Sequence, residues 1–110
     1  MTTARTVLKA EEYFQEHADD PISIDDAART LGVSVRSLQR AFQTERNTTP
    51  MRYLKSVRLD RARARLLQGG TRTNVTQIAM ISGFTHLGAF SQDYRRCFGE
   101  APSETLRRPR

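Results

Sequence analysis

The feature that most constrains the fold of this chain is an internal repeat. At an offset of 51 residues, Ile24, Ala28, Gly32 and Val33 match Val75, Ala79, Gly83 and Phe84. At an offset of 52 residues, Leu38, Phe42 and Pro50 match Phe90, Tyr94 and Pro102. The second copy therefore contains one additional residue after its turn. A repeat of this kind predicts two similar structural units in one chain.

Each copy has the pattern of a helix-turn-helix. An alanine precedes a glycine by four residues in both, Ala28 before Gly32 and Ala79 before Gly83. The small alanine lets two helices cross closely, and the glycine permits a sharp turn. One such match is weak, because many helix pairs contain it, but two copies in register are specific. A duplicated helical hairpin that serves only for packing is the alternative.

Apolar periodicity and capping residues predict seven helices and no strand. The expected ranges are about 6–17, 24–31, 35–46, 50–68, 75–82, 86–98 and a short turn from Pro102. The predicted N-caps are Ser23, Ser34, Asn74 and Thr85, and the predicted buried side of 50–68 is Leu54, Val57, Leu59, Ala62, Leu66 and Leu67. The fold class is all-α: one domain, 1–110, with helix-turn-helix subdomains at 6–49 and 74–107 joined by the long linker helix 50–68.

Charge is distributed unevenly along the chain. Residues 1–34 contain three basic and seven acidic residues, a sum of −4, and residues 35–110 contain 15 basic and 5 acidic residues, a sum of +10. Sixteen of the 18 basic residues are arginine. A surface of one sign attracts a polyanion, and the arginine fork suits phosphate and guanine edges. Taken alone, the charge is equally consistent with a solvated basic face.

Composition and motifs exclude several classes of protein. The sequence has no apolar run of 18 residues, and its first 14 residues lack the apolar stretch typical of a signal peptide, so we expect a cytoplasmic protein without a membrane partner. With one cysteine and two histidines, a disulfide framework or zinc-held fold is excluded. The sequence has no G-x-S-x-G, G-x-G-x-x-G or phosphate-binding loop, so we expect no enzyme, cofactor or metal site. Cys97 is predicted to be buried beside Phe90 and Tyr94, which argues against a methyl-accepting cysteine.

Four stretches carry a resemblance to a known family. They are IDDAARTLGVSVRSLQRAFQ at 24–43, PMRYLKSVRLDRARARLL at 50–67, VTQIAMISGF at 75–84 and FSQDYRRCFGEAPSE at 90–104. They resemble the DNA-binding domain of the AraC/XylS transcription regulators, over about residues 6–107. The resemblance implies two helix-turn-helix units on a linker helix, each placing its second helix in a major groove. Family members usually carry this domain in a longer chain with a sensor or dimerisation domain.

The helix at 35–46 carries the first set of candidate DNA contacts. Leu38 and Phe42 must face the core, so the opposite face presents Arg36, Gln39, Arg40 and Gln43, with Val35 at its edge. Arginine can bond guanine twice, and glutamine can do the same with adenine. The resemblance also places Arg36 and Arg40 at positions that commonly contact bases. We therefore expect Val35, Arg36, Gln39 and Arg40 to read bases, with an ordinary polar helix surface as the alternative.

The helix at 86–98 departs from this pattern. Its candidate contacts are His86, Leu87, Gly88, Ser91 and Gln92, and Gly88 stands where the first copy has Arg36. A glycine there implies close backbone approach to DNA or loss of base readout, so we expect the first unit to carry most readout. Helix N-termini and polar side chains predict phosphate contacts at Ser23, Ser34, Gln43, Asn74, Thr85, Arg95 and Arg96. For Ser34 and Thr85 a purely capping role remains open.

These features predict a bacterial, sequence-specific regulator that binds double-stranded DNA. We expect a monomer on an asymmetric site, activation rather than repression, RNA polymerase as a second partner, a location at the nucleoid, and dimerisation only through a further domain. A 19-residue linker spans roughly 28 Å, whereas successive major grooves lie ~34 Å apart. Simultaneous insertion of both recognition helices would therefore require bent DNA. The alternatives are a protein-interaction module acting through the acidic residues 1–34 and a non-specific nucleic-acid-binding protein.

Overall fold

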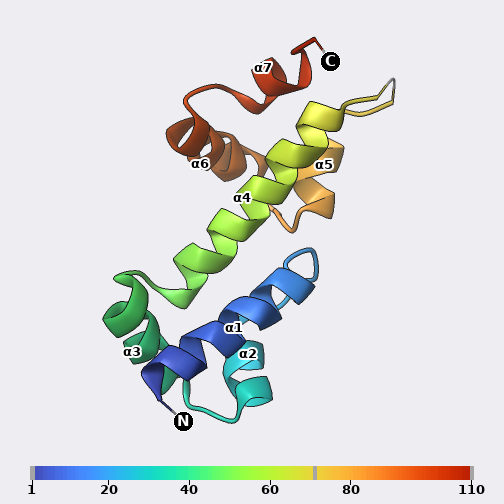
Figure 1. The fold of residues 1–110 in the computed structure, drawn as a ribbon. Helices are drawn as coiled ribbons and strands as arrows, with labels where there is room; N and C mark the ends of the chain where they lie inside the picture. The colour runs from blue at the N-terminus through green and yellow to red at the C-terminus, as the bar shows by residue number, and fades with distance from the viewer. Residues whose placement is uncertain (1, 71, 110) are drawn as a thin grey trace. The chain divides into compact units, whose positions relative to one another are not determined.

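The computed structural model describes residues 2–70 and 72–109, and within these ranges it contains seven α-helices and no strand (Figure 1). The helices are α1 (Thr3–His17), α2 (Ile24–Leu31), α3 (Val35–Arg46), α4 (Pro50–Gln68), α5 (Val75–Ile81), α6 (Leu87–Phe98) and α7 (Pro102–Leu106). This confirms the predicted all-α class. Among the described helices, none combines the length and the apolar composition required to cross a membrane.

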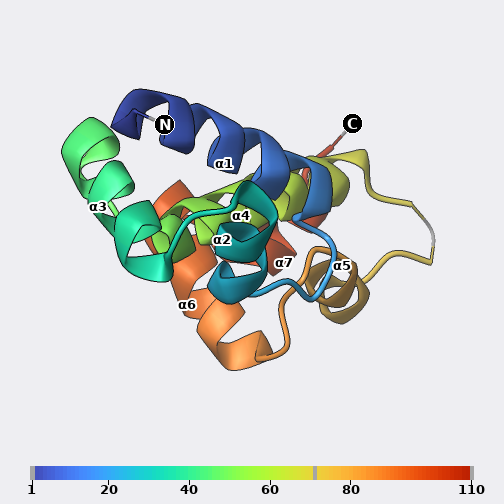
Figure 2. The same ribbon diagram turned by 90° about the horizontal axis from the view of Figure 1, so that it is seen from below.

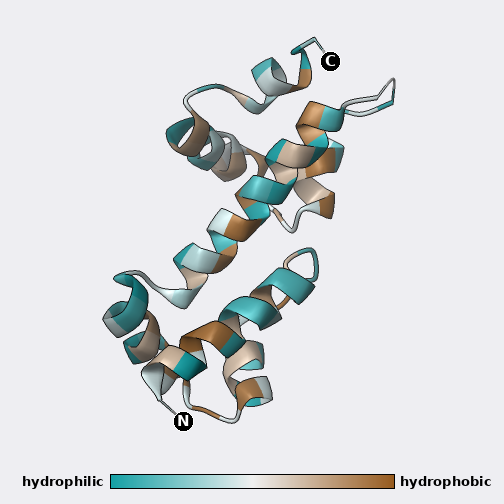
Figure 3. Cartoon of the chain, in the orientation of Figure 1, coloured by the Kyte–Doolittle hydropathy of each residue, from teal (hydrophilic) through white to brown (hydrophobic). Residues whose placement is uncertain are grey.

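Two compact units make up the chain, Met1–Val57 and Arg58–Arg110, and the boundary lies within α4. The long helix supplies buried residues to each unit, Leu54 and Val57 to the first and Leu59, Ala62 and Leu66 to the second. Figure 3 shows hydrophobic and hydrophilic residues mixed along α4.

The first unit packs α1 against α2 and α3, and Figure 2 shows α3 beside the N-terminal part of α1. Its core contains three aromatic rings from three helices, those of Phe14, Phe42 and Tyr53. Their centroids are 6.2 Å apart for Phe14 and Phe42, and 5.8 Å apart for Phe42 and Tyr53. Because Leu38 and Phe42 are fully buried, the face of α3 that carries them is fixed toward this core.

The second unit has a core around Phe90 and Tyr94 of α6. Unlike its counterpart Phe42, Tyr94 carries a hydroxyl, which donates a buried hydrogen bond of 2.7 Å to Thr105 Oγ1 of α7. The Thr105 hydroxyl in turn donates to the Glu100 carboxylate, and Glu100 also pairs with Arg108. This polar chain satisfies the buried tyrosine and attaches α7 to α6.

The repeat found in the sequence recurs in the backbone hydrogen bonds. In the first turn the Val33 amide donates to the Ala28 carbonyl over 3.0 Å, and in the second the Phe84 amide donates to the Ala79 carbonyl over 2.9 Å. The glycine of each turn has a positive φ, 74° and 96° respectively, which only glycine adopts at little cost. Both turns therefore have the same construction, as the sequence predicted.

Two predicted helix starts are wrong. Helix α1 begins at Thr3, about three residues earlier than predicted, because the Thr2 side chain accepts a hydrogen bond from the Arg5 amide and acts as the N-cap. Thr85 is not the N-cap of α6, since His86 occupies that position without a side-chain hydrogen bond. The additional residue of the second copy lies before the cap, so the position matching Ser34 shifts from 85 to 86.

Two predictions of burial are also wrong. Leu67 is 38% exposed, because neighbouring residues on a helix point about 100° apart and Leu66 occupies the buried direction. Cys97 is exposed as well, since Phe98 continues the stripe instead, with its ring centroid 4.7 Å from that of Tyr94. Partial desolvation and the nearby Asp60 raise the pKa of the Cys97 thiol, so it stays protonated at neutral pH.

Candidate nucleic-acid interface

The exposed face of α3 presents the polar side chains that were predicted from the sequence to lie there. Ser34 begins the helix by accepting a hydrogen bond of 3.0 Å from the Ser37 amide. The buried stripe described above then turns the following side chains outward, and all four are exposed: Arg36, Gln39, Arg40 and Gln43. Val35 differs, because it is half-buried and packs against the core of the first unit.

Arg36 and Arg40 are the two guanidinium groups of this face. Neither forms a hydrogen bond or ion pair with another residue in the described part of the chain. They lie four residues apart, so they project from neighbouring turns of one side of α3. Gln43, in contrast, donates to the side-chain oxygen of Asn47 at 2.8 Å. The two arginines are thus available to bind an external acceptor without breaking an internal contact.

The corresponding face of α6 has shorter and less polar side chains. Leu87 is 43% exposed, Gln92 is exposed and Ser91 is half-buried. Gly88 lies within the helix without a positive φ, and a methyl group there would have no heavy atom of the described residues within 4 Å, apart from its immediate surroundings. No packing contact within the described chain therefore requires a glycine at this position.

The arginines of α6 are paired, unlike Arg36 and Arg40 of α3, for which the described residues supply no partner. Arg96 Nη1 lies 3.3 Å from Asp93 Oδ1, and Arg95 Nη2 lies 3.7 Å from Glu104 Oε1. Glu104 also accepts a hydrogen bond of 3.1 Å from the Ala101 amide at the start of α7. Neither carboxylate was predicted from the sequence as a partner, although Asp93 lies at the i, i+3 spacing typical of a helical ion pair.

The predicted phosphate sites at helix N-termini differ in local charge. The Ser23 amide donates to the Asp26 carboxylate at 2.9 Å, and the hydrogen bonds with Ser23 lower the pKa of Asp26. With Asp25, this places two carboxylates in the first turn of α2, and their charges oppose a phosphate. The first turns that follow Ser34, Asn74 and His86 contain no acidic residue. Thr85, just before His86, is exposed.

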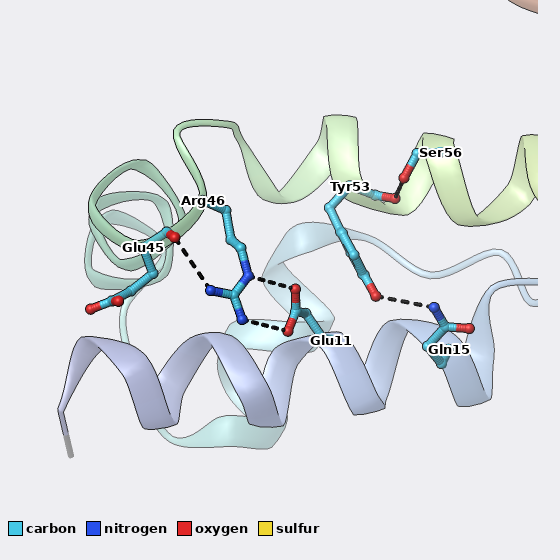
Figure 4. Close-up of polar contacts among 6 residues, drawn as sticks. All are labelled: Glu11, Gln15, Glu45, Arg46, Tyr53 and Ser56. Carbon is cyan, nitrogen blue, oxygen red and sulfur yellow. Dashed lines mark hydrogen bonds and ion pairs between the residues drawn. The ribbon is translucent and has the colours of Figure 1, made fainter. Parts of the chain in front are cut away.

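The C-terminal end of α3 is attached to α1 by side-chain contacts (Figure 4). Arg46 forms a bidentate ion pair with Glu11, with Nε–Oε2 and Nη2–Oε1 distances of 3.1 and 3.2 Å. The hydrogen bonds and the charge of Glu11 raise the pKa of Arg46. One residue earlier, Glu45 accepts a hydrogen bond of 2.6 Å from the Thr3 hydroxyl. Nothing local in the sequence signals these contacts, because each joins residues 35 or more positions apart.

Comparison with known proteins agrees with this geometry. A family described as a helix-turn-helix domain matches residues 27–108. The crystal structure of a probable AraC family transcriptional regulator from Rhodopseudomonas palustris CGA009 aligns with a TM-score of 0.89 and 43% identity, covering 96% of this chain and 99% of that chain. The chain belongs to the AraC family of transcriptional regulators. It is a DNA-binding domain of this family, whose members are regulators and not enzymes, as the sequence predicted.

Two curated relatives of this AraC-family domain are bacterial regulators. The probable thc operon regulatory protein of Rhodococcus erythropolis is 46% identical over 102 residues, which is 92% of this chain and 31% of that protein. The XylDLEGF operon transcriptional activator 2 of Pseudomonas putida is 38% identical over 96 residues, 86% of this chain and 61% of that protein. The chain thus spans less than two thirds of the length of either relative.

Proposed function

We propose that this domain recognises one asymmetric site in double-stranded DNA, with α3 and α6 as the recognition helices. In this proposal the linker helix 50–68 joins two helix-turn-helix subdomains, 6–49 and 74–107. The observation that carries the proposal is the pair of exposed arginines on α3, Arg36 and Arg40, which have no hydrogen bond or ion pair with any residue that the structure describes. Their forks can each donate two hydrogen bonds to a guanine in the major groove.

In this proposal the first unit reads most of the base sequence. Gln39 lies on the same exposed face as the two arginines, and the half-buried Val35 would offer only part of its side chain to a thymine methyl. The second unit would read fewer bases, through Gln92 and Leu87, with His86 and Ser91 at its margin. Gly88 offers no side chain, so it can contribute only backbone proximity.

We also propose which groups bind phosphate. Arg95 and Arg96 are exposed and can exchange their carboxylate partners for phosphates. Gln43 and Thr85 are exposed and can add neutral hydrogen bonds, and the N-termini at Ser34 and Asn74 are free of acidic residues. We expect Ser23 to bind phosphate more weakly than these sites, because Asp25 and Asp26 lie in the first turn of its helix.

The regulatory role is a further part of the proposal. The name of the Pseudomonas relative, a transcriptional activator, supports activation in preference to repression. Two non-identical recognition helices in one chain favour a monomer on an asymmetric site, with any dimerisation left to another domain. RNA polymerase would then be a second partner, and the cytoplasmic nucleoid the location. Light scattering of the DNA complex tests the stoichiometry, since two chains on one selected site would contradict it.

Site selection followed by affinity measurement tests the base-reading role. The selected duplex and a scrambled duplex are titrated with wild type and with Arg36→Ala, Arg40→Ala and the control Arg5→Ala, which removes the same charge from an exposed position on α1. Each lost bidentate contact should cost about 1–3 kcal/mol on the selected duplex only. The control should change both affinities slightly and equally. An equal loss on both duplexes for Arg36→Ala would mean that Arg36 binds phosphate.

A further inference from the structure

We propose that Arg46 and Glu11 are positioning residues, whose ion pair fixes the orientation of α3 and thereby the base selectivity of the first unit. Arg46 is the last residue of α3, and Glu11 lies in the middle of α1. The inference rests on the proposed base-reading role of α3. It assigns a function in recognition to two residues that need not touch DNA.

The geometry of the pair is suited to fixing an orientation. Both hydrogen bonds, 3.1 and 3.2 Å long, join the guanidinium fork to the two carboxylate oxygens. A bidentate pair of this kind fixes the relative direction of two side chains as well as their distance. The Glu11 side chain is only 20% exposed and that of Arg46 is 41% exposed, so solvent competes less than at an open surface pair.

The pair lies at the end of α3 that the turn does not hold. The N-terminal end of α3 is held by the Ser34 cap and the turn at Gly32. At its C-terminal end the chain turns at Asn47, which has a positive φ of 52°. Arg40 lies six residues before Arg46, about 9 Å along a helix axis, so loosening this end tilts the exposed face. Base contacts tolerate misplacement of only about 0.5 Å.

The second unit has a contact between the corresponding residues. At the repeat offset of 52, positions 11 and 46 correspond to 63 and 98. There the Arg63 guanidinium lies 5.2 Å from the centroid of the Phe98 ring, a cation–π contact that lacks the two fixed hydrogen bonds of the first unit. In both units, therefore, the last residue of the recognition helix contacts a helix earlier in the chain, α1 in the first unit and α4 in the second. Of these two contacts, the one in the first unit, which also carries Arg36 and Arg40, is bidentate.

The direction in which one substitution changes the affinity for DNA distinguishes a positioning role from a purely electrostatic one. Glu11→Gln removes a negative charge, so electrostatics alone predicts that the domain binds every DNA equally well or more tightly. Positioning predicts weaker binding, confined to the selected sequence. Glu12→Gln is the matched control: Glu12 is the next residue of α1, is exposed, and has no hydrogen bond or ion pair with any residue that the structure describes.

The test measures affinity for the selected and the scrambled duplex with wild type, Glu11→Gln, Glu12→Gln, Arg46→Gln and the Glu11→Gln/Arg46→Gln double variant. For the selected duplex we expect Glu11→Gln and Arg46→Gln each to lose about three- to tenfold, and the double variant to lose no more than the larger single loss. For the scrambled duplex, Glu11→Gln should match Glu12→Gln. Circular dichroism at the assay temperature verifies that each variant is folded, so a loss of stability cannot imitate the result.

Two outcomes would overturn the positioning role. The first is equal behaviour of Glu11→Gln and Glu12→Gln on both duplexes. The second is an equal loss on both duplexes for Arg46→Gln without a loss for Glu11→Gln, because Arg46 would then bind phosphate, and the salt slope would fall by about 1. A wild type that bound both duplexes alike would instead refute the base-reading function itself.

Discussion

Replacing Gly88 by alanine should stabilise the protein, although the residue lies at the candidate DNA interface. Gly88 is helical without a positive φ, and an added methyl group would meet none of the described atoms within 4 Å outside its immediate surroundings. Glycine inside a helix costs about 1 kcal/mol relative to alanine. Because Gly88 is the second residue of α6, where fewer helical hydrogen bonds depend on it, we expect about 0.5 kcal/mol.

Gly32→Ala is the matched control, since the same methyl group is added at a second open position. Apart from Gly32 itself and its two chain neighbours, no described heavy atom lies within 4 Å of that methyl group, but Gly32 has φ 74°. A residue with a Cβ in this left-handed conformation costs about 1–2 kcal/mol. The two substitutions therefore differ mainly in backbone conformation, and their effects on stability should have opposite signs.

Thermal unfolding followed by circular dichroism measures both variants. For a domain of about 100 residues, 1 kcal/mol shifts the Tm by roughly 4–8 °C. Gly88→Ala should therefore raise the Tm by about 2–4 °C, and Gly32→Ala should lower it by at least about 4 °C. A lower Tm for Gly88→Ala would refute the reasoning, because the fold itself would then require the glycine.

DNA binding by the same variant separates the two explanations of Gly88. If the DNA backbone approaches Gly88 closely, the methyl group of Gly88→Ala weakens binding to all duplexes while the Tm still rises. If the position is merely an empty reading site, the affinity is unchanged, and Gly88→Arg should alter the base preference of the second half of the selected site. An unchanged preference for Gly88→Arg, together with unchanged affinity for Gly88→Ala, would place this position outside the interface.

Three further predictions concern the second unit. Thr105→Val leaves the buried Tyr94 hydroxyl without its acceptor and should lower the free energy of unfolding in urea by about 1–3 kcal/mol. Tyr94→Phe should lower it by less, ~1 kcal/mol. A larger loss for Tyr94→Phe than for Thr105→Val would contradict the direction of the hydrogen bond. Leu66→Ala should cost about 2–5 kcal/mol and Leu67→Ala less than about 0.5 kcal/mol, and equal costs would contradict their different burial. The Thr105 hydrogen bond lowers the pKa of Glu100, so its stabilisation is present above about pH 4.3 and lost as the pH falls through the lowered value. Glu100→Gln should therefore be less stable than wild type at pH 7 and approach it in acid, as pH-dependent unfolding would show.

The helices could be predicted from the sequence because their signals are local. The predicted ranges of α3 and α4 match the structure, since a cap or a proline begins each and a left-handed residue or glycine pair follows each. The prediction failed where two local signals competed. Thr85 has better N-cap chemistry than His86, but the buried positions of Phe90 and Tyr94 set the phase of α6, and packing outweighs a single cap.

The exposed face of α3 could be predicted for the same reason, because two buried residues fix the direction of all the others on a helix. The partners of charged side chains could not. Glu104 reaches Arg95 from a different helix, and Glu11 reaches Arg46 across 35 residues, so no periodicity announces either contact. Only the structure could therefore show that Glu104 pairs with Arg95, whereas Arg36 and Arg40 have no hydrogen bond or ion pair among the described residues.

The structure also extends the repeat by one helix. At the offset of 52, three buried residues of α1 correspond to three buried residues of α4: Val7 to Leu59, Ala10 to Ala62 and Phe14 to Leu66. The C-terminal half of α4 thus contributes to the core of the second unit as α1 contributes to the core of the first. In both units packing restricts which residues can occupy the buried positions, whereas the exposed positions are not restricted in this way. That freedom allows one copy to present Arg36 and the other Gly88 on the same fold, so the two units can differ in what they read without differing in how they are built.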